Sequence, residues 1–198
     1  MLFANHQAFN DPRSRQAAMG VDLHPQFQVR DASGNVLFHL QTGGMINPQR
    51  CELSEGAPLM RFASGSSNAL RSMGGGWWTE QTSFDRIFRF AQVHEVPIIL
   101  AARILCGVPP EWSDMRLLVR VRLRRPMLAW RGLANTVVIP HPGGGPHVRM
   151  LHQNLDAERR LFQVYIPGLD TLPVSELLLF EREDRFSEID SKRGWLYL

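Results

Sequence analysis

Two charged residues that interrupt apolar segments are the first candidates for chemistry in this sequence. Arg61 lies within "LMRFA", and Glu176 begins "ELLLF". An arginine in such a setting can pair with a carboxylate, or hold a phosphate or a ribose with its planar guanidinium. A carboxylate at the start of a strand points out of the sheet and can face a cleft. The plainer interpretation of each residue is a solvated charge, which is the commoner outcome for charged side chains.

The segment "GGGWWTEQTSFDRIFRFA" (74–91) places three glycines directly before Trp77 and Trp78. One interpretation is a turn followed by core aromatic side chains. The other is a binding site, because glycine lets the backbone approach a ligand closely and an indole can stack on a flat ring. Side chains of a strand alternate between its two faces, so the two tryptophans cannot both point into one cleft. We therefore expect one of them to be buried in the core.

The order of these parts resembles the ADP-ribosyltransferase superfamily, whose members bind NAD in the cleft of a split sheet. The resemblance rests on "LMRFAS", "GGGWWTEQTSFDRIFRFA" and "PVSELLLF", three short motifs within residues 58–183. Arg61 matches the first-strand arginine of the toxin branch, and Thr79 is the counterpart of part of its Ser-Thr-Ser motif. Phe88 has the spacing from Trp78 of an aromatic residue that stacks on nicotinamide in the polymerase branch. That branch has histidine and tyrosine where Arg61 and Phe88 stand, the full Ser-Thr-Ser motif is absent, and Val174 replaces the Glu or Gln of arginine-modifying members.

The resemblance implies that NAD is the substrate and that the nicotinamide–ribose bond is broken. The transition state of that reaction carries positive charge on the sugar, which a fixed carboxylate stabilises. The site residues that follow are Glu176 as the catalytic carboxylate and, for NAD binding, Arg61, Gly76, Trp77, Trp78, Thr79, Phe88 and Gln163. Both transfer to an unknown protein or nucleic-acid acceptor and hydrolysis by an NAD glycohydrolase remain open. A bacterial toxin or effector with an immunity or chaperone partner fits this interpretation.

The alternative is a binding domain without enzymatic activity. Its strongest support is the series of arginines from Arg116 to Arg125, around "LVRVRLRR", which could contact the phosphate backbone of a nucleic acid. The aromatic residues are not interleaved with this series, and a solvated strand face explains it more simply. A second form of the alternative is an inactive relative of the transferases that binds a protein partner through the cleft.

The hydrophobic pattern predicts an α+β fold with a compact split sheet, mixed or antiparallel, and few helices. Strands are expected at 58–64, at the tryptophans, and at 118–126, 160–169 and 175–183. A helix is expected from near Thr82, with a capping box formed by Thr82 and Asp85, and it should end before Pro97. The segment "IILAARIL" fits either a buried strand or a helix. Residues 26–41 predict a β-hairpin, and residues 42–57 a loop.

These elements suggest an N-terminal extension over 1–57 and a catalytic domain over 58–198. The extension could be a translocation segment, a chaperone-binding arm or part of the fold. The sequence has no apolar run long enough to span a bilayer and no expected secretory signal peptide, which predicts a cytoplasmic protein or an effector translocated by another route. Cys51 and Cys106 are expected to be free thiols, and no histidine or cysteine spacing indicates a metal site.

Overall fold

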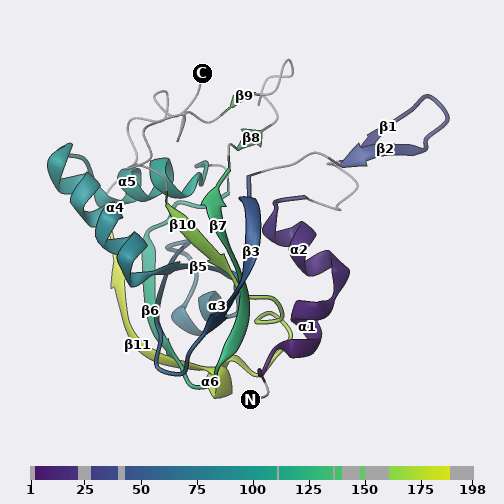
Figure 1. Ribbon diagram of the computed structural model, residues 1–198. Coiled ribbons are helices and arrows are strands. Elements are labelled where there is room, and N and C mark those ends of the chain that lie inside the picture. Colours follow the sequence, from purple (N-terminus) through teal and green to yellow (C-terminus); the bar gives the residue numbers. More distant parts are fainter. Residues whose placement is uncertain are drawn as a thin grey trace.

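The computed structural model describes residues 3–21, 28–39, 43–110, 112–135, 137–139, 148–149 and 161–187. Within these ranges the chain forms short helices around one large sheet (Figure 1). The helices are α1 (His6–Asn10), α2 (Pro12–Ala18), α3 (Ala69–Met73), α4 (Gln81–Val93), α5 (Ile98–Cys106) and α6 (Val174–Leu177). The strands are β1 (Gln28–Arg30), β2 (Val36–His39), β3 (Met45–Leu53), β4 (Pro58–Ala63), β5 (Trp77–Glu80), β6 (Leu117–Leu123), β7 (Met127–Ala134), β8 (Val138–Ile139), β9 (Val148–Arg149), β10 (Phe162–Tyr165) and β11 (Leu178–Arg185).

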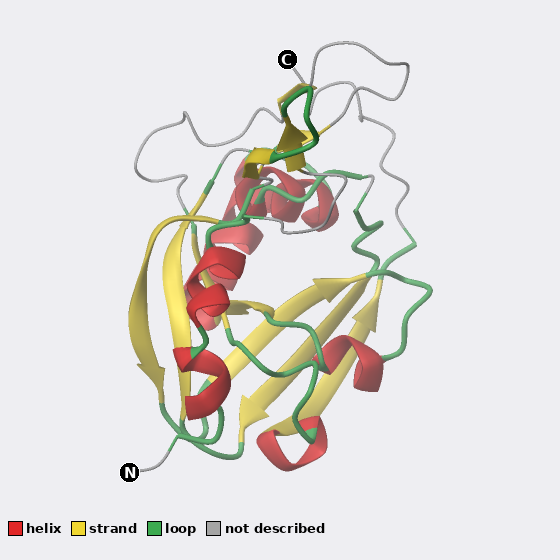
Figure 2. Ribbon diagram, turned by 90° about the vertical axis from the view of Figure 1, so that its right-hand side faces the viewer, coloured by secondary structure: helices red, strands yellow, loops and turns green. Residues whose placement is uncertain are grey.

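The large sheet has seven strands in the order β11-β6-β4-β5-β10-β7-β3, and every neighbouring pair is antiparallel. Its centre is the short strand β5, which shares only two residue pairs with β4 and two with β10. β5 therefore joins two three-stranded halves of the sheet. In Figure 2 one group of strands stands nearly upright and another group is inclined to it. The fold class is α+β, as the sequence predicts.

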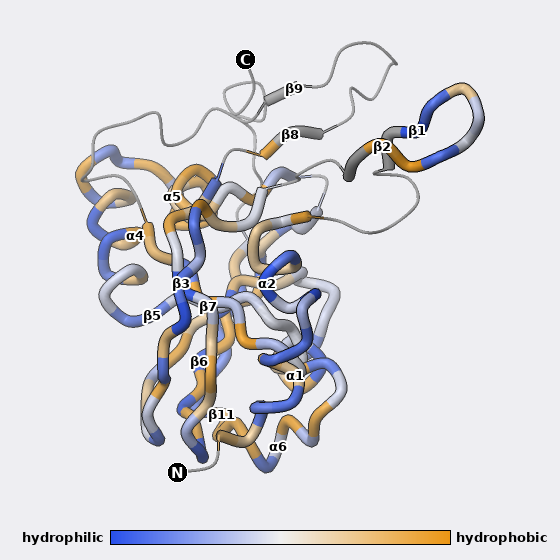
Figure 3. Tube along the Cα trace, turned by 45° about the vertical axis from the view of Figure 1, so that its right-hand side comes forward, coloured by the Kyte–Doolittle hydropathy of each residue, from blue (hydrophilic) through white to orange (hydrophobic). Residues whose placement is uncertain are grey.

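Burial follows the alternation of apolar residues along the central strands. Val119, Val121 and Leu123 of β6 are almost fully buried, and Arg122 between them is exposed. They join the main core together with Trp78, Val164 and Ile166. A second apolar cluster forms where α4 meets α5, which is hydrophobic along most of its length (Figure 3). The main core includes residues of β4, β5 and β10, and these strands carry most of the residues expected at the site.

The N-terminal helices are attached to the sheet by a buried asparagine. The side chain of Asn5 donates to the carbonyl oxygens of Leu128 and Pro167 and accepts from the backbone N–H of Leu128. Phe9 of α1 stacks on Trp130 of β7 at 4.5 Å between ring centroids. Residues 45–53, expected as part of a loop, form the edge strand β3. The described residues before position 57 thus include elements that belong to the same packed structure as the rest.

Several local expectations are confirmed. β1 pairs with β2 as an antiparallel hairpin within 26–41, β4 and β10 lie within the predicted strands, and β5 and β6 overlap theirs. The segment "IILAARIL" is helical, as α5. The predicted capping box is wrong, because α4 begins at Gln81 and has no side-chain cap. The expectation that Glu176 begins a strand is also wrong, because it lies in the single turn α6 before β11.

Candidate functional site

A cavity of about 1260 Å³ opens beside the junction of β4, β5 and β10. Its walls come from α2, the β4–α3 segment, the glycine turn before β5, the end of α5 and the loop before β6. This volume exceeds the roughly 300–1,000 Å³ of sites that hold drug-sized ligands. Of the residues predicted from the sequence, the cavity brings together Arg61, Trp77, Trp78, Thr79 and Gln163.

Arg61 is a half-buried charge on the wall of this cavity. Its Nη1 donates to the carbonyl oxygen of Trp77 at 2.7 Å, whereas its buried Nε has no hydrogen-bond partner among the described residues. No ion pair links it to a carboxylate in that part of the chain. Burial lowers the pKa of Arg61 to about 10, so the guanidinium keeps its charge at neutral pH. A buried cation that no carboxylate balances is costly, and an anionic ligand would reduce that cost.

The two tryptophans have different environments, as strand alternation requires. Trp78 is 2% exposed, and its indole Nε1 donates to the carbonyl oxygen of Gly75 at 2.7 Å. Trp77 is half-buried and lies against Tyr165, with ring centroids 5.1 Å apart. Trp78 is thus mainly a core residue. Trp77 is the better placed of the two to offer a ring face to a ligand.

Two of the three glycines before the tryptophans, Gly75 and Gly76, are required by close packing. A Cβ on Gly75 would overlap the guanidinium of Arg61, and one on Gly76 would lie 2.6 Å from the Tyr165 ring. Gly76 itself does not line the cavity. Its predicted role as a ligand contact therefore finds no support in the cavity, and its small size serves the packing of Tyr165.

Polar groups from β5, β10 and α5 meet in one part of the cavity wall. Gln163 donates from Nε2 to the carbonyl oxygen of Cys106 at 2.5 Å, and Thr79 is nearly buried beside them. Burial raises the pKa of the Cys106 thiol to about 12, although hydrogen bonds with Thr79 and Gln163 act in the opposite direction. This thiol is therefore neutral at physiological pH.

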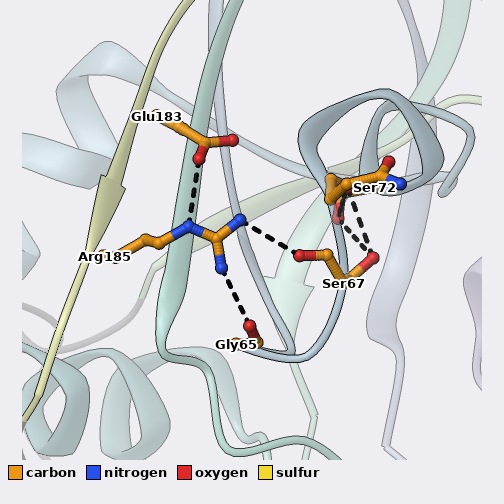
Figure 4. Close-up of polar contacts among 6 residues, drawn as sticks. Gly65, Ser67, Ser72, Glu183 and Arg185 are labelled. Carbon is orange, nitrogen blue, oxygen red and sulfur yellow. Dashed lines mark hydrogen bonds and ion pairs between the residues drawn. The ribbon is translucent and has the colours of Figure 1, made fainter.

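A serine-rich segment that the sequence analysis did not single out forms another wall. Ser64, Ser66, Ser67 and Ser72 line the cavity, and the hydroxyl of Ser72 donates to Ser67 Oγ at 3.1 Å (Figure 4). The segment leads into α3, whose first turn is capped by the side chain of Asn68. The available signal was the run "SGSSN" directly after the strand that carries Arg61, since small hydroxyl residues before a helix favour a turn and a cap.

Two of the predicted site residues lie elsewhere. Glu176 is exposed on α6 and does not line the cavity. Phe88 is 50% exposed on α4 and does not line it either. The expected arrangement, with Glu176 facing Arg61 across one cleft, is therefore not seen. Among the described residues of the cavity wall, the only acidic one is Asp170, which is exposed and follows β10.

The arginines of β6 are largely engaged with the neighbouring strand. Arg120 pairs with Asp184 at 3.3 Å and Arg122 with Glu181 at 2.5 Å, both across to β11. Their charges are balanced within the sheet, which weakens the expectation of a nucleic-acid surface here. Within the described ranges, no group of three or more acidic, histidine or cysteine side chains could hold a metal ion. None of the helices described here is long and apolar enough to cross a membrane.

Comparisons with known proteins give similarity to solved structures only. No family model matches the chain, and no curated protein does. A solved structure described as "Rhs1-CT in complex with cognate immunity protein RhsI1" aligns with 77% of this chain and 88% of its own. The sequence identity is 13% and the TM-score is 0.39. At these values the similarity assigns neither a family nor an activity to this chain.

Proposed function

We propose that the cavity binds NAD and that the protein breaks its nicotinamide–ribose bond, as an ADP-ribosyltransferase or an NAD glycohydrolase. The observation that carries the proposal is Arg61, a half-buried guanidinium on the cavity wall; among the described residues its buried Nε has no hydrogen-bond partner and no carboxylate pairs with it. Such a group favours a ligand that brings negative charge, and the pyrophosphate of NAD does so.

The other walls match the remaining parts of this ligand. Trp77 supplies an aromatic face suited to the flat nicotinamide ring, and the serine hydroxyls can bind ribose or phosphate oxygens. Arg71 lies on the same wall, and no hydrogen bond or ion pair with another described residue engages its guanidinium, which leaves it able to bind an anion. Together these groups favour a large, anionic and partly aromatic molecule.

In the proposed reaction the bond between the nicotinamide nitrogen and ribose C1′ breaks, and its electron pair leaves with neutral nicotinamide. The sugar cation is captured by water or by an acceptor hydroxyl or amine, which loses a proton to solvent. We assign to Asp170 the carboxylate role that the resemblance gave to Glu176, because Asp170 lines the cavity. Burial raises the pKa of Tyr165, and the negative charge of Asp170 raises it further. Tyr165 in turn packs on Trp77.

An enzyme that consumes NAD would deplete the NAD of the cell that synthesises the enzyme. A role as a toxin or effector, and an immunity partner that blocks the cavity in the producing cell, therefore belong to the same proposal. The acceptor is left open, because none of the described cavity residues distinguishes water from a protein or nucleic-acid acceptor.

The test is nicotinamide release from NAD, measured by chromatography together with NAD binding by calorimetry. We expect activity in the wild type, a loss of at least about tenfold in Asp170→Asn, and no change in Glu176→Gln. Loss of activity in Glu176→Gln alone would restore Glu176 to the catalytic role. Absence of both binding and release in the wild type would overturn the proposal, and binding without release would leave a dinucleotide-binding module.

A further inference from the structure

Arg185, at the end of β11, spans two segments that are far apart in the sequence. Its Nη1 donates to the carbonyl oxygen of Gly65 at 2.9 Å, and its Nη2 donates to that of Ser67 at 3.3 Å. Its Nε donates to Glu183 Oε1 on the same strand at 3.0 Å. All three nitrogens of the guanidinium are thus engaged, as Figure 4 shows.

The segment that Arg185 holds is the serine-rich wall of the cavity. Ser64, Ser66 and Ser67 line the cavity, whereas Arg185 and Gly65 do not. Arg185 therefore contacts the backbone of this segment from outside the cavity. It is not in a position to touch a ligand there.

The same segment is fixed at a second point from outside. Asp114 Oδ1 accepts the backbone N–H of Gly65 at 2.7 Å, and a Cβ on Gly65 would lie 2.9 Å from the Cβ of Arg116. Short exposed segments rich in serine and glycine lose much conformational entropy when they become ordered. External bonds to the backbone N–H and the carbonyl oxygen of Gly65 compensate for part of that loss before a ligand binds.

We propose that Arg185 is a positioning residue for the cavity: it holds the carbonyls of Gly65 and Ser67 so that the hydroxyls of Ser64, Ser66 and Ser67 are arranged to receive the ligand. The identity of that ligand as NAD rests on the proposed function. Preorganisation of this kind increases affinity because less freedom is lost on binding. β11, which carries Arg185, then controls the affinity of the cavity for its ligand although Arg185 does not contact the ligand.

The guanidinium geometry is essential to this role. A lysine would keep the positive charge, but its compact ammonium cannot reproduce the planar fork that joins two carbonyls and the Glu183 carboxylate. Charge alone therefore does not restore the arrangement. Arg182 offers a matched control, because it lies on the same strand and its guanidinium donates to Asp184, outside the serine-rich segment.

The experiment compares wild type, Arg185→Lys, Arg185→Gln and Arg182→Gln. Hydrogen exchange of peptides covering residues 64–68 is measured without ligand. The Kd for NAD is measured separately by calorimetry. In both Arg185 variants we expect faster exchange in 64–68 and a Kd raised about tenfold, as loss of two charge-assisted hydrogen bonds can produce. In Arg182→Gln neither quantity should change, and thermal unfolding shows that each variant is folded.

Unchanged exchange in 64–68 in the Arg185 variants would overturn the inference. So would faster exchange with an unchanged Kd, because the segment would then be ordered by Arg185 without consequence for binding. An equal rise in Kd in Arg182→Gln would point to a general effect of β11 and would count against Arg185. If the wild type does not bind NAD, the proposed function fails, and the exchange measurement alone decides whether Arg185 orders this wall.

Discussion

The guanidinium of Arg61 rests directly on the backbone of Gly75, so closely that a Cβ at position 75 would overlap it. The carbonyl oxygen of Trp77, two residues later, accepts a hydrogen bond from Arg61 Nη1 at 2.7 Å. The glycine-rich turn thus passes over the arginine and then supplies its acceptor. This explains why glycine precedes the two tryptophans: the turn must lack a side chain at position 75, where the Arg61 guanidinium contacts the backbone.

Gly75→Ala should displace Arg61 and weaken both folding and ligand binding. Insertion of a methyl group into a packed site costs about 1–3 kcal/mol of unfolding free energy. Gly74→Ala is the matched control, since its φ is −71° and the nearest atoms to a Cβ there lie 3.5 Å away or more. Urea unfolding and NAD titration of the two variants check the prediction. If both variants behaved alike, Arg61 would not be held in place by Gly75.

Arg61→Met should abolish NAD binding without reducing stability. Burial lowers the pKa of Arg61 to about 10, so the cost of burying its charge is present at every pH below that value and eases as pH rises through it. Methionine removes the cost at neutral pH. We expect a free energy of unfolding equal to that of the wild type or about 1–2 kcal/mol higher.

Urea unfolding and calorimetry with NAD at pH 7 measure the two effects on Arg61→Met separately. A marked loss of stability would mean that the bond to the Trp77 carbonyl outweighs the buried charge. Retained NAD affinity would remove Arg61 from the binding site.

Trp77 and Trp78 should separate binding from stability. Trp78 is 2% exposed in the main core, so Trp78→Ala should cost about 3–5 kcal/mol of unfolding free energy. Trp77 lines the cavity beside Tyr165, so Trp77→Ala should remain folded and lose NAD affinity. Thermal unfolding and NAD titration distinguish the variants. The opposite pattern would show that Trp78 presents its ring to the ligand.

The alternation of apolar and polar residues predicts the strand positions and buried faces that depend only on local sequence. The alternation along 117–123 places Val119 and Val121 in the core, and the strand that carries Arg61 lies where the pattern indicates. The same reasoning fails at Glu176, because "SELLLF" reads as one apolar strand. Residues 174–177 instead form a helical turn after Pro173, and β11 begins only at Leu178.

The serine-rich wall and Asp170 could not be assigned from the sequence for a different reason. The segment that contains Ser66 and Ser67 is bonded at Gly65 to Arg185, about 120 residues away, and to Asp114. Asp170 lies just beyond β10, and its position beside the cavity follows from the pairing of β10 with β5. Such placements are decided by tertiary contacts, which one sequence does not reveal.

The two thiols should be unreactive in the folded protein and should make its stability depend on pH. Burial raises the pKa of Cys106 to about 12, and burial followed by the charge of Glu80 raises that of Cys51 to about 11. In the unfolded chain a thiol ionises near pH 8.5. The stability that the neutral thiols contribute is therefore complete below about pH 8.5 and is lost as pH rises toward their folded pKa values.

Labelling with a thiol-specific disulfide reagent at pH 8 checks the first part. We expect slow reaction of the native protein and rapid reaction of two thiols in denaturant, because the thiolate is the reactive form. Urea midpoints between pH 8 and 10 check the second part, with a Cys51→Ala/Cys106→Ala variant as the control whose midpoint falls less. Rapid labelling of native Cys106 would contradict both parts, since a thiol on the cavity wall that reacts freely would have to be ionised and accessible to solvent.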